Sequence, residues 1–322
     1  MNPIDSANIT AQTRVFVCCD LDVPIRNGRI DETYRLEAVL PTLLYLKQFT
    51  KNIIIAGHLG KPKGQVVPEL STQILKPFFD EHLGSGNYEL MENLRFDPRE
   101  ETNDPEYARE LASKADIYVN EIFSTSHRKH ASIIGIPRLI PSFAGKRLIL
   151  EVVTLKKAVE NPKKPLVAII GGAKVESKLP VINKFLRISD AVLIGGKLGM
   201  EWKQSIPDNM FMPKDYLEDN KDIGPETVKG FAAIIQTAKT IIWAGPMGAY
   251  EEEKYAGGTR SIAEAIVSSP AFKIAGGGDT LAALNKFGYL ERFDFVSTGG
   301  GAMLEFIAKG TLPGLEALDY HG

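Results

Sequence analysis

Phe272-Lys273-Ile274-Ala275-Gly276-Gly277-Gly278-Asp279-Thr280 is an apolar run that stops at three glycines. Four other apolar runs in the second half of the chain also end at glycine clusters, at 166–170, 191–194, 240–243 and 293–296. Such runs are typical of buried parallel strands, and parallel α/β sheets bind ligands at the carboxyl ends of their strands. Glycine backbone can approach a phosphate closely and turn N–H groups toward it. The pattern therefore predicts a parallel sheet whose glycine-lined mouth binds a phosphorylated ligand.

The first half of the chain also alternates strand and helix patterns. We expect strands at 15–19, 52–56 and 116–120, and helices at 34–49, interrupted by Pro41, at 106–114, capped by Asp104, and at 148–159. The segment Asn161-Pro162-Lys163-Lys164-Pro165 is poor in apolar residues, and we place the domain hinge there. Both halves therefore predict doubly wound α/β layers.

Composition restricts the class of protein. The chain has 322 residues, a length that suggests about two domains, and its net charge of -2 favours neither nucleic acid nor an anionic membrane. No apolar run has the length of a membrane helix, and Met1-Asn2-Pro3-Ile4-Asp5 lacks the features of a signal peptide. The two cysteines, Cys18 and Cys19, are adjacent and would face opposite ways on a strand. We expect a cytoplasmic protein.

Two common nucleotide signatures are absent from the sequence. No Gly-x-Gly-x-x-Gly follows a strand, and no Gly-Lys is followed by Ser or Thr. His127 and His130 have a spacing that could suit a metal but lack Cys or acidic partners nearby. Ordinary surface or substrate-facing histidines are the better interpretation of this pair.

The glycine cluster at 276–278 is the sharpest local motif. The helix that follows begins at Asp279-Thr280, and a helix N-terminus presents N–H donors and partial positive charge to an anion. Asp279 could hold Mg²⁺ beside the phosphates. Taken alone, the motif is explained equally well by a tight turn with Asp279 or Thr280 as a plain cap. The four similar clusters at other strand ends favour the ligand site.

Cationic residues accompany the strand ends in both halves. Lys174 and Lys178 are four apart, so a helix would place them on one face, beside Gly171-Gly172. Two such cations suit a transferring phosphoryl group, although a solvated lysine face is the commoner role of an isolated pair. The first half has a set of cations whose placement after strands predicts an anion site: Arg35, His58, Lys61, Arg95 and Arg128. We expect Cys18, Asp20 and Asp22 to share one face beside this set, with Cys18 as a small buried residue.

The chain resembles the phosphoglycerate kinase family over nearly its whole length. In the first half the matching motifs are Asp20-Leu21-Asp22-Val23-Pro24, Ala38-Val39-Leu40-Pro41-Thr42, His58-Leu59-Gly60-Lys61-Pro62-Lys63-Gly64, Glu92-Asn93-Leu94-Arg95-Phe96 and His127-Arg128-Lys129-His130-Ala131-Ser132. In the second half they are Gly171-Gly172-Ala173-Lys174-Val175, Asp222-Ile223-Gly224-Pro225, Trp243-Ala244-Gly245-Pro246-Met247-Gly248, Gly276-Gly277-Gly278-Asp279-Thr280, Ser297-Thr298-Gly299-Gly300-Gly301-Ala302 and Leu312-Pro313-Gly314. So many motifs in one order make coincidence an unsatisfactory explanation.

The resemblance implies two doubly wound parallel-sheet domains joined by a hinge helix. Residues 1–155 would bind 3-phosphoglycerate, residues 156–310 would bind Mg-ATP or Mg-ADP, and residues 311–322 would return to the first domain. Domain closure would bring the substrates together, and the γ-phosphate of ATP would pass reversibly to a carboxylate, giving an acyl phosphate. The resemblance also implies a monomeric glycolytic kinase with small-molecule ligands, Mg²⁺ as the metal, and neither nucleic acid nor membrane as a partner.

The same resemblance implies individual roles. The acceptor would contact Asp20, Asp22, Arg35, His58, Lys61, Arg95 and Arg128, and the catalytic groups would be Arg35, Lys174 and Lys178. The nucleotide would contact Gly172, Ala173, Lys178, Gly195, Gly196, Pro246, Glu251, Gly276, Gly277, Gly278, Asp279 and Thr280. Glu251 would reach the ribose, and Asp279 would hold Mg²⁺.

The sequence also departs from the family pattern. The family has arginine at Cys18 and Lys61, asparagine at Asp22 and Ala244, a third glycine at Lys197 and aspartate at Ser177. Material is missing between Gly64 and Met91 and between Met200 and Asp222, where we expect lost strand–helix units.

These departures leave three alternatives. The chain is a divergent glycolytic enzyme, a kinase for another phosphate- or phosphonate-bearing carboxylate, or a non-catalytic nucleotide-binding relative. Retention of Arg35, Lys174, Lys178 and Asp279 argues against the last. Asp22 beside Asp20 mildly favours the second, because a carboxylate pair disfavours an anionic acceptor.

Overall fold

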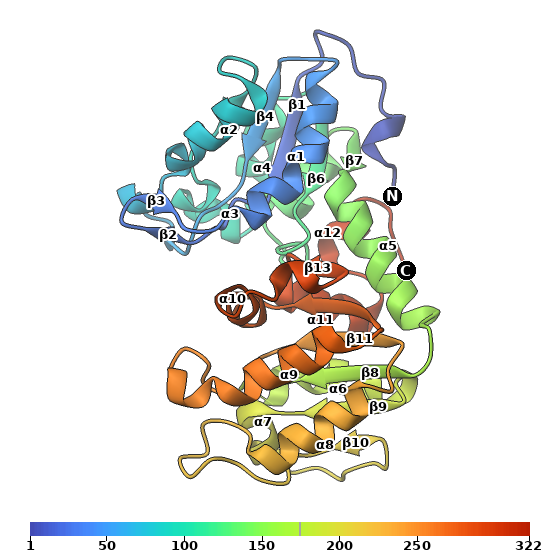
Figure 1. Cartoon of the computed structure of the whole chain (residues 1–322). Helices are drawn as coiled ribbons and strands as arrows, with labels where there is room; N and C mark the ends of the chain where they lie inside the picture. The colour runs from blue at the N-terminus through green and yellow to red at the C-terminus, as the bar shows by residue number, and fades with distance from the viewer. Residues whose placement is uncertain (174) are drawn as a thin grey trace. The chain divides into compact units, whose positions relative to one another are not determined.

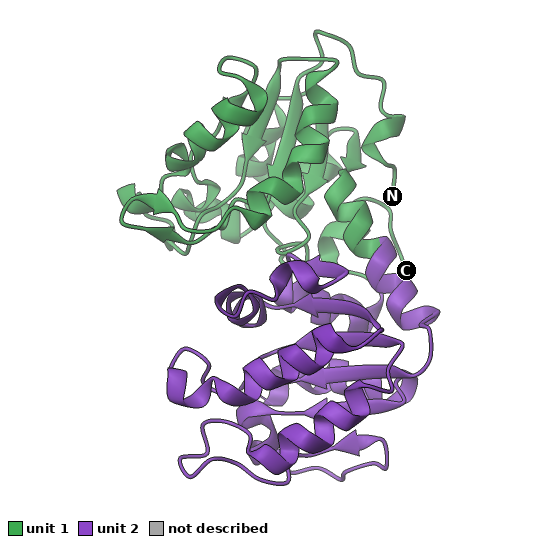
Figure 2. Cartoon of the chain, viewed as in Figure 1, with its two compact units in different colours: residues 1–152, 311–322 green, residues 153–310 purple. Residues whose placement is uncertain are grey.

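The computed structural model describes residues 1–173 and 175–322 (Figure 1). The chain divides into two compact units, one made of residues 1–152 and 311–322 and the other of residues 153–310 (Figure 2). Each unit has its own parallel sheet, which confirms the predicted fold class. None of the described helices is both long and apolar enough to cross a membrane.

The sheet of the first unit has five strands in the order β5-β4-β1-β6-β7, and all its pairs are parallel. The strands are β1 (Val15–Cys19), β4 (Ile53–Ala56), β5 (Glu89–Leu90), β6 (Ile117–Glu121) and β7 (Ser142–Ala144). β1 is central and completely buried, with Val15 opposite both Ile53 and Ile117. A separate antiparallel hairpin is formed by β2 (Ile25–Arg26) and β3 (Arg29–Ile30). Loops at the carboxyl ends of β1, β4 and β6 therefore gather at one edge.

Helices and short turns connect these strands. The helices are α1 (Tyr34–Lys47), α2 (Lys76–Leu83), α3 (Pro98–Glu101), α4 (Pro105–Ala112), α5 (Lys146–Glu160) and α12 (Pro313–Glu316). The short turns are η1 (Ile4–Ser6), η2 (Pro68–Leu70), η3 (Thr72–Leu75), η4 (Leu94–Phe96), η5 (Ala131–Gly135) and η6 (Ile136–Arg138). The boundary between the two units falls within α5.

Two sequence features of these helices have different outcomes. Asp104 caps α4 as predicted, since its side chain accepts from the amides of Glu106 and Tyr107. The expected interruption at Pro41 is wrong, because α1 continues through it. Proline removes one intrahelical hydrogen bond, but the buried face of α1, which includes Leu36 and Leu43, stays in the core on both sides of it.

The sheet of the second unit has six parallel strands in the order β10-β9-β8-β11-β12-β13. The strands are β8 (Leu166–Ile170), β9 (Ala191–Ile194), β10 (Met210–Phe211), β11 (Thr240–Ala244), β12 (Phe272–Gly276) and β13 (Phe295–Ser297). β13 begins two residues later than predicted. A short turn ends at Arg292, and Asp294 is held by the amide of Lys273, so the strand starts beyond them.

The helices of the second unit are the end of α5, α6 (Val175–Ile188), α7 (Gly196–Glu201), α8 (Pro225–Ile235), α9 (Gly257–Ser268), α10 (Gly278–Lys286) and α11 (Gly300–Lys309), with short turns η7 (Glu253–Tyr255) and η8 (Leu290–Arg292). α11 packs against α6, and α8 packs against α9. α6, α7, α10 and α11 each begin at or just after a glycine turn, so their first turns lie at the carboxyl edge of the sheet.

The two regions predicted to be shortened both lie at a sheet edge. Between Gly64 and Met91 the chain forms β5, and between Met200 and Asp222 it forms β10. Each is an outermost strand and only two residues long. The central strands β1 and β8, which precede predicted ligand loops, are five residues long and buried throughout.

Candidate active site

A group of charged side chains lies at the carboxyl edge of the first unit's sheet. Arg35, in the first turn of α1, donates from Nη1 to the carbonyl of Asp22 at 3.0 Å and lies 3.4 Å from Asp20 Oδ1. Asp20 is almost completely buried, and within the described residues its Oδ2 has no hydrogen-bond partner. A buried carboxylate oxygen without a donor is costly unless something satisfies it. Asp20 therefore keeps one acceptor oxygen unsatisfied close to Arg35.

Asp22 occupies part of this cationic group. Its Oδ1 accepts from the amide of Gly60 at 2.8 Å, and its Oδ2 lies 3.7 Å from His58 Nε2 and 3.8 Å from Arg35 Nη1. Burial alone would raise the pKa of Asp22, but the hydrogen bonds and charges of these neighbours outweigh it and hold the pKa well below its usual range. Asp22 is therefore an anion built into the cationic site.

We expected Asp20 and Asp22 to share a strand face with Cys18, and this expectation is wrong. β1 ends at Cys19, and the amide of Val23 then bonds the carbonyl of Leu21 at 2.9 Å in a tight turn. This turn aims Asp20 toward Arg35 and Asp22 toward His58.

Arg95 extends the positive group. It is buried, its Nη1 donates to the carbonyl of Gly60 at 3.1 Å, and its side chain lies 3.6 Å from Glu101. Burial lowers the pKa of Arg95, nearby carboxylates led by Glu101 oppose that shift, and the charge of the exposed Arg128 adds a smaller lowering. Lys61 is exposed and has no ion-pair partner among the described residues. The structure therefore gathers His58, Arg95 and Arg128 and leaves Lys61 at the rim.

His130 also belongs to this cluster; the sequence suggested an ordinary surface or substrate-facing histidine, and His130 was not among the predicted site residues. Burial, together with the charges of Arg95, His58 and Arg128, lowers the pKa of His130 to about 3. His130 is consequently neutral at physiological pH and can offer a hydrogen bond without adding charge. The motif His127-Arg128-Lys129-His130 was the available signal for it.

Cys18 is a buried thiol, as expected. Burial raises its pKa to about 12, and its Sγ faces Ser132 Oγ at 3.8 Å. Ser132 in turn donates to the buried Glu100 at 2.6 Å from its hydroxyl and at 3.0 Å from its amide. Burial raises the pKa of Glu100 to about 7. Position 18 therefore holds a neutral thiol, which Ser132 connects to a buried carboxyl with a raised pKa.

The glycine turns of the second unit pack against one another. Gly172 donates its amide to the carbonyl of Pro246 at 2.7 Å, and Gly245 donates its amide to Thr280 Oγ1 at 2.7 Å. A Cβ at Gly300 would lie 2.5 Å from the Cα of Gly277, which has φ of 108°. Only residues without a side chain allow this approach. The turns after β8, β11, β12 and β13 thus form one continuous backbone surface.

The first turn of α10 has free amide donors in this surface. The first intrahelical bond runs from Leu281 to the carbonyl of Gly277, so the amides of Gly278, Asp279 and Thr280 have no partner inside the helix. Gly278 and Asp279 are exposed, whereas Thr280 is buried and links α10 to Gly245. The helix begins one residue earlier than predicted. This arrangement suits an anion at the N-terminus of a helix.

Lys178 lies beside this turn. Its ammonium donates to the carbonyl of Gly171, and its charge interacts with Asp279. Burial lowers its pKa to about 8, although Asp279 opposes the shift. Its predicted partner Lys174 lies outside the described residues.

The remaining residues that were predicted to bind the nucleotide lie in or near the same glycine turns. Glu251 is exposed in the loop after β11, and Pro246 is buried against Gly171 and Gly172. Gly196 would meet the backbone of Gly172 with any added Cβ. Ala173 follows Gly172 directly. Lys197 pairs with Glu201 at 3.2 Å along α7 and takes no part in the glycine surface.

The donor set fits a magnesium nucleotide. Mg²⁺ is usually held by one or two carboxylates together with phosphate oxygens. Asp279 offers one exposed carboxylate at the start of α10, next to the free amides and Lys178. No cluster of three or more His, Cys, Asp or Glu side chains suited to a metal occurs in the described part of the chain. The residues therefore fit a metal that arrives with its nucleotide.

Comparisons with known proteins agree with this arrangement. The profile of the family described as phosphoglycerate kinase matches residues 4–210 and 203–309. The phosphoglycerate kinase of Roseiflexus sp. (strain RS-1) is 37% identical over 387 positions, which cover 95% of this chain and 96% of the relative. That of Moorella thermoacetica is 35% identical over 376 positions, with coverage of 95% and 96%.

Solved structures give the same result. Phosphoglycerate kinase from Coxiella burnetii superposes with a TM-score of 0.83 at 31% identity, covering 98% of each chain. The enzyme from Pyrococcus horikoshii OT3 also superposes with a TM-score of 0.83, at 29% identity over 99% of this chain and 98% of the other.

The alignments also account for the chain's length. Since 95% of 322 residues is about 306, roughly 80 of the 387 positions aligned with the Roseiflexus protein have no residue here. The two profile matches overlap at residues 203–210, within the region between Met200 and Asp222 where we expected missing material. Despite this shortening, the matches extend over almost the whole chain, and the chain belongs to the phosphoglycerate kinase family.

Proposed function

We propose that this chain transfers the γ-phosphoryl group of Mg-ATP reversibly to the carboxylate of 3-phosphoglycerate. The first unit would bind the acceptor and the second unit the nucleotide. Family membership supports this reaction, and the charged groups at the carboxyl edge of each sheet support the division of roles.

In the first unit, His58, Arg95 and Arg128 would hold the acceptor's phosphate, with Lys61 at the rim. The unsatisfied Oδ2 of Asp20 would accept the acceptor's hydroxyl, since this buried oxygen has no donor within the described residues. Arg35, anchored by Asp20 and the carbonyl of Asp22, would lie at the reacting carboxylate. A guanidinium held on two sides keeps its remaining N–H groups in a fixed direction.

In the second unit, the free amides of 278–280 and the ammonium of Lys178 would bind the nucleotide phosphates. The surrounding glycines, with Ala173, would let the phosphates approach the backbone, while Pro246 and Glu251 would border the nucleoside. Asp279 would hold Mg²⁺, which neutralises phosphate charge when bound. Lys174 would act with Lys178 at the transferring group, a role that rests on family resemblance alone.

The chemistry requires stabilisation of charge. A carboxylate acceptor has a pKa near 4 and is already ionised at neutral pH, so it needs no general base. The barrier comes from bringing two anions together and from charge on the transferring oxygens. Fixed cations and amides in a site that excludes water stabilise that charge and protect the acyl phosphate from hydrolysis.

One observation carries the proposal. Lys178, Asp279 and the first amides of α10, which have no partner inside the helix, lie together on one glycine surface. Steady-state turnover of 3-phosphoglycerate with Mg-ATP, measured as ADP release, tests it. Turnover at ordinary kinase rates of about 1–100 per second is expected. Binding of Mg-ATP without turnover of any carboxylate would instead indicate the non-catalytic alternative.

One observation favours a second candidate, a kinase for a less anionic carboxylate. Asp22 places a carboxylate against His58, Arg35 and the amide of Gly60, where an acceptor anion would otherwise bind. An acceptor bearing a hydroxyl or an amine at this point would be favoured over 3-phosphoglycerate. A panel of carboxylates assayed for ADP release distinguishes the two candidates by their ratio of kcat/KM.

We further propose that the protein acts as a monomer in the cytoplasm. Both charged groups are built from one chain, and the two cysteines are free and buried. Light scattering on the purified protein would test the oligomeric state.

A further inference from the structure

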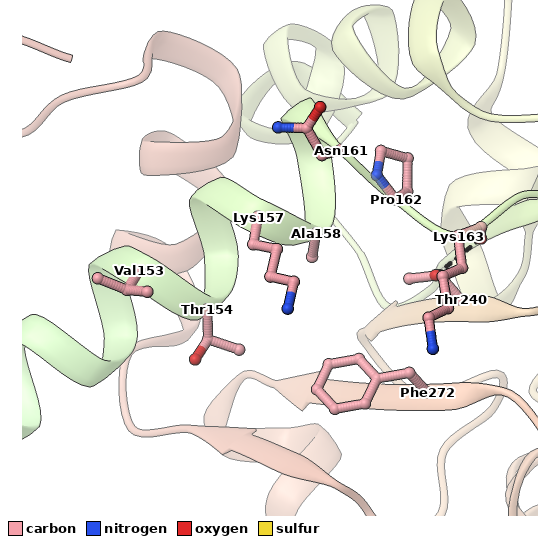
Figure 3. A pocket seen from close by; sticks show the side chains of 9 residues that line it. All are labelled: Val153, Thr154, Lys157, Ala158, Asn161, Pro162, Lys163, Thr240 and Phe272. Carbon is pink, nitrogen blue, oxygen red and sulfur yellow. Dashed lines mark hydrogen bonds between the residues drawn. The ribbon is translucent and has the colours of Figure 1, made fainter.

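The second unit has a cavity at the edge of its sheet opposite the glycine turns. It lies between the end of α5 and the starts of β11 and β12 and has a volume of about 310 Å³ (Figure 3). Thr240 and Phe272 are the first residues of their strands, whereas the glycines follow the last residues. The cavity is therefore separate from the proposed nucleotide site and has no role in the reaction described above.

The walls of the cavity are largely apolar. Phe272 is 41% exposed and Val153 is 57% exposed, and both line it with Ala158 and Pro162. Exposed apolar groups around a concavity gain free energy when a ligand covers them, by about 25 cal/mol per Å². A phenyl ring that forms part of the wall offers a flat face for a flat ligand.

Two ammonium groups complete the lining. In Figure 3 the side chains of Lys157 and Lys163 extend from the opposite wall toward the Phe272 ring. Within the described residues, neither ammonium has a carboxylate within 4.0 Å or donates a hydrogen bond. The backbone of Lys163 is held in place, because Thr240 Oγ1 donates to its carbonyl at 2.8 Å.

The acidic residues near the cavity are already paired with other lysines. Glu160 lies 3.8 Å from Lys156, Asp190 lies 3.1 Å from Lys164, and Asp294 lies 3.5 Å from Lys273. Among the residues that the structure describes, no carboxylate is therefore in contact with the ammonium groups of Lys157 and Lys163. A ligand in this cavity is favoured if it supplies an anion.

We propose that this cavity binds a small amphipathic organic anion, a flat apolar body carrying a carboxylate, sulfonate or phosphate. The apolar body would cover Phe272 and Val153, and the acidic group would pair with Lys157 and Lys163. The volume is at the lower end of the range for small-molecule sites, about 300–1,000 Å³, so the occupant is a metabolite-sized molecule.

Fluorescence titration with anilinonaphthalene sulfonate tests the proposal, because this probe has both features. The full-length protein is used with saturating Mg-ATP, so that the nucleotide site is filled. We expect saturable binding that Lys157→Gln with Lys163→Gln weakens about tenfold or more, which is about 1.4 kcal/mol. Phe272→Ser should weaken it as well. Lys229→Gln, an exposed lysine of α8 away from the cavity, is the matched charge control and should change binding less than about twofold.

A neutral probe distinguishes binding through ion pairs with the lysines from nonspecific apolar binding. Phenylnaphthylamine has the same apolar body without the sulfonate, and its binding should be insensitive to the double lysine substitution. Sulfonate binding that survives this substitution, or that Lys229→Gln weakens equally, would overturn the proposal. The phosphotransfer assay gives an independent readout, since neither lysine belongs to the proposed active site.

Discussion

At the scale of single residues, Asp22 has the most direct consequence for the acceptor. Its carboxylate already interacts with His58 and Arg35. Asp22→Asn keeps an oxygen for the amide of Gly60 and removes the charge, so the KM for 3-phosphoglycerate should fall, by roughly tenfold for about 1.4 kcal/mol of relieved repulsion. The KM for ATP is the control and should not change. An unchanged or higher KM for 3-phosphoglycerate would mean that Asp22 does not repel the acceptor.

Arg35 should act mainly on turnover. It is held by Asp20 and the carbonyl of Asp22 in the first unit, whereas the proposed nucleotide surface is built from residues of the second unit. Arg35→Ala should therefore lower kcat by about a hundredfold or more while the Kd for ATP, measured by calorimetry, changes little. Arg26→Ala removes an exposed arginine that pairs with Asp31 and serves as the control. Equal losses of turnover and of ATP affinity would contradict this role.

Lys178 predicts a pH dependence with a definite sign. Burial lowers its pKa to about 8, so the free enzyme loses this positive charge as the pH rises through that value. Because the ammonium form binds phosphate, kcat/KM for ATP should decline above about pH 8. Lys178→Met should lower kcat/KM and abolish the decline. A decline of the same shape in Lys178→Met would assign it to another group.

At the scale of elements, the close approach of two glycine turns limits what the start of α11 can carry. A Cβ at Gly300 would meet the Cα of Gly277 at 2.5 Å, so the backbone must move. Gly300→Ala should destabilise the protein by about 1–3 kcal/mol in urea unfolding and weaken ATP binding, since Gly277 shapes the turn before α10. At Gly278 a Cβ meets nothing within 4 Å, so Gly278→Ala is the control for stability. Equal stability of both variants would show that the two turns can separate freely.

The position of the two shortened regions explains how the rest of each sheet keeps its structure. β5 and β10 are two-residue strands at the outer edges of their sheets. Edge strands contact one neighbour, so removing material there leaves the hydrogen bonds of β1 and β8 and their ligand loops in place. The charged groups of both units are accordingly preserved in a shorter chain.

At the scale of the whole molecule, buried carboxyls should make stability fall between pH 6.5 and pH 8. Burial raises the pKa of Glu121 to about 8 and that of Glu100 to about 7, above the values of the unfolded chain. The native state therefore binds more protons than the unfolded state in this range, and its stability falls as the pH rises. The lowered pKa of His130, about 3, opposes this decline mainly below pH 7, where the unfolded imidazole binds a proton, and that of Lys178, about 8, opposes it mainly above pH 8.

Glu121→Gln tests this expectation. Glu121 accepts from the amide of Arg147 at the start of α5, and a neutral amide cannot titrate. The decline in unfolding free energy between pH 6.5 and pH 8 should become smaller by about 1–2 kcal/mol in the variant. Urea unfolding at both pH values measures it. An unchanged slope would show that Glu121 does not hold a proton in the native state.

Much of the fold could be predicted from local patterns. β1, β8 and β9 have the predicted bounds. A strand that is buried on both faces is a continuous apolar run, so its ends can be recognised in the sequence. Asp104 was recognisable as a cap because capping is decided within four residues. Pro41 and the start of β13 were mispredicted, because core packing and a contact from Lys273 to Asp294 decided them.

The sequence by itself determined the alternation of strand and helix, the glycine turns at the strand ends and the family to which the chain belongs. These features depend on residues close together in the chain, or on motifs in a given order. Tertiary structure alone decided that Asp22 occupies the cationic group, that Asp20 keeps an unsatisfied oxygen, and that His130 is held neutral. Those properties depend on distances and burial between segments far apart in the sequence, because electrostatic interactions depend on separation in space and on access to water.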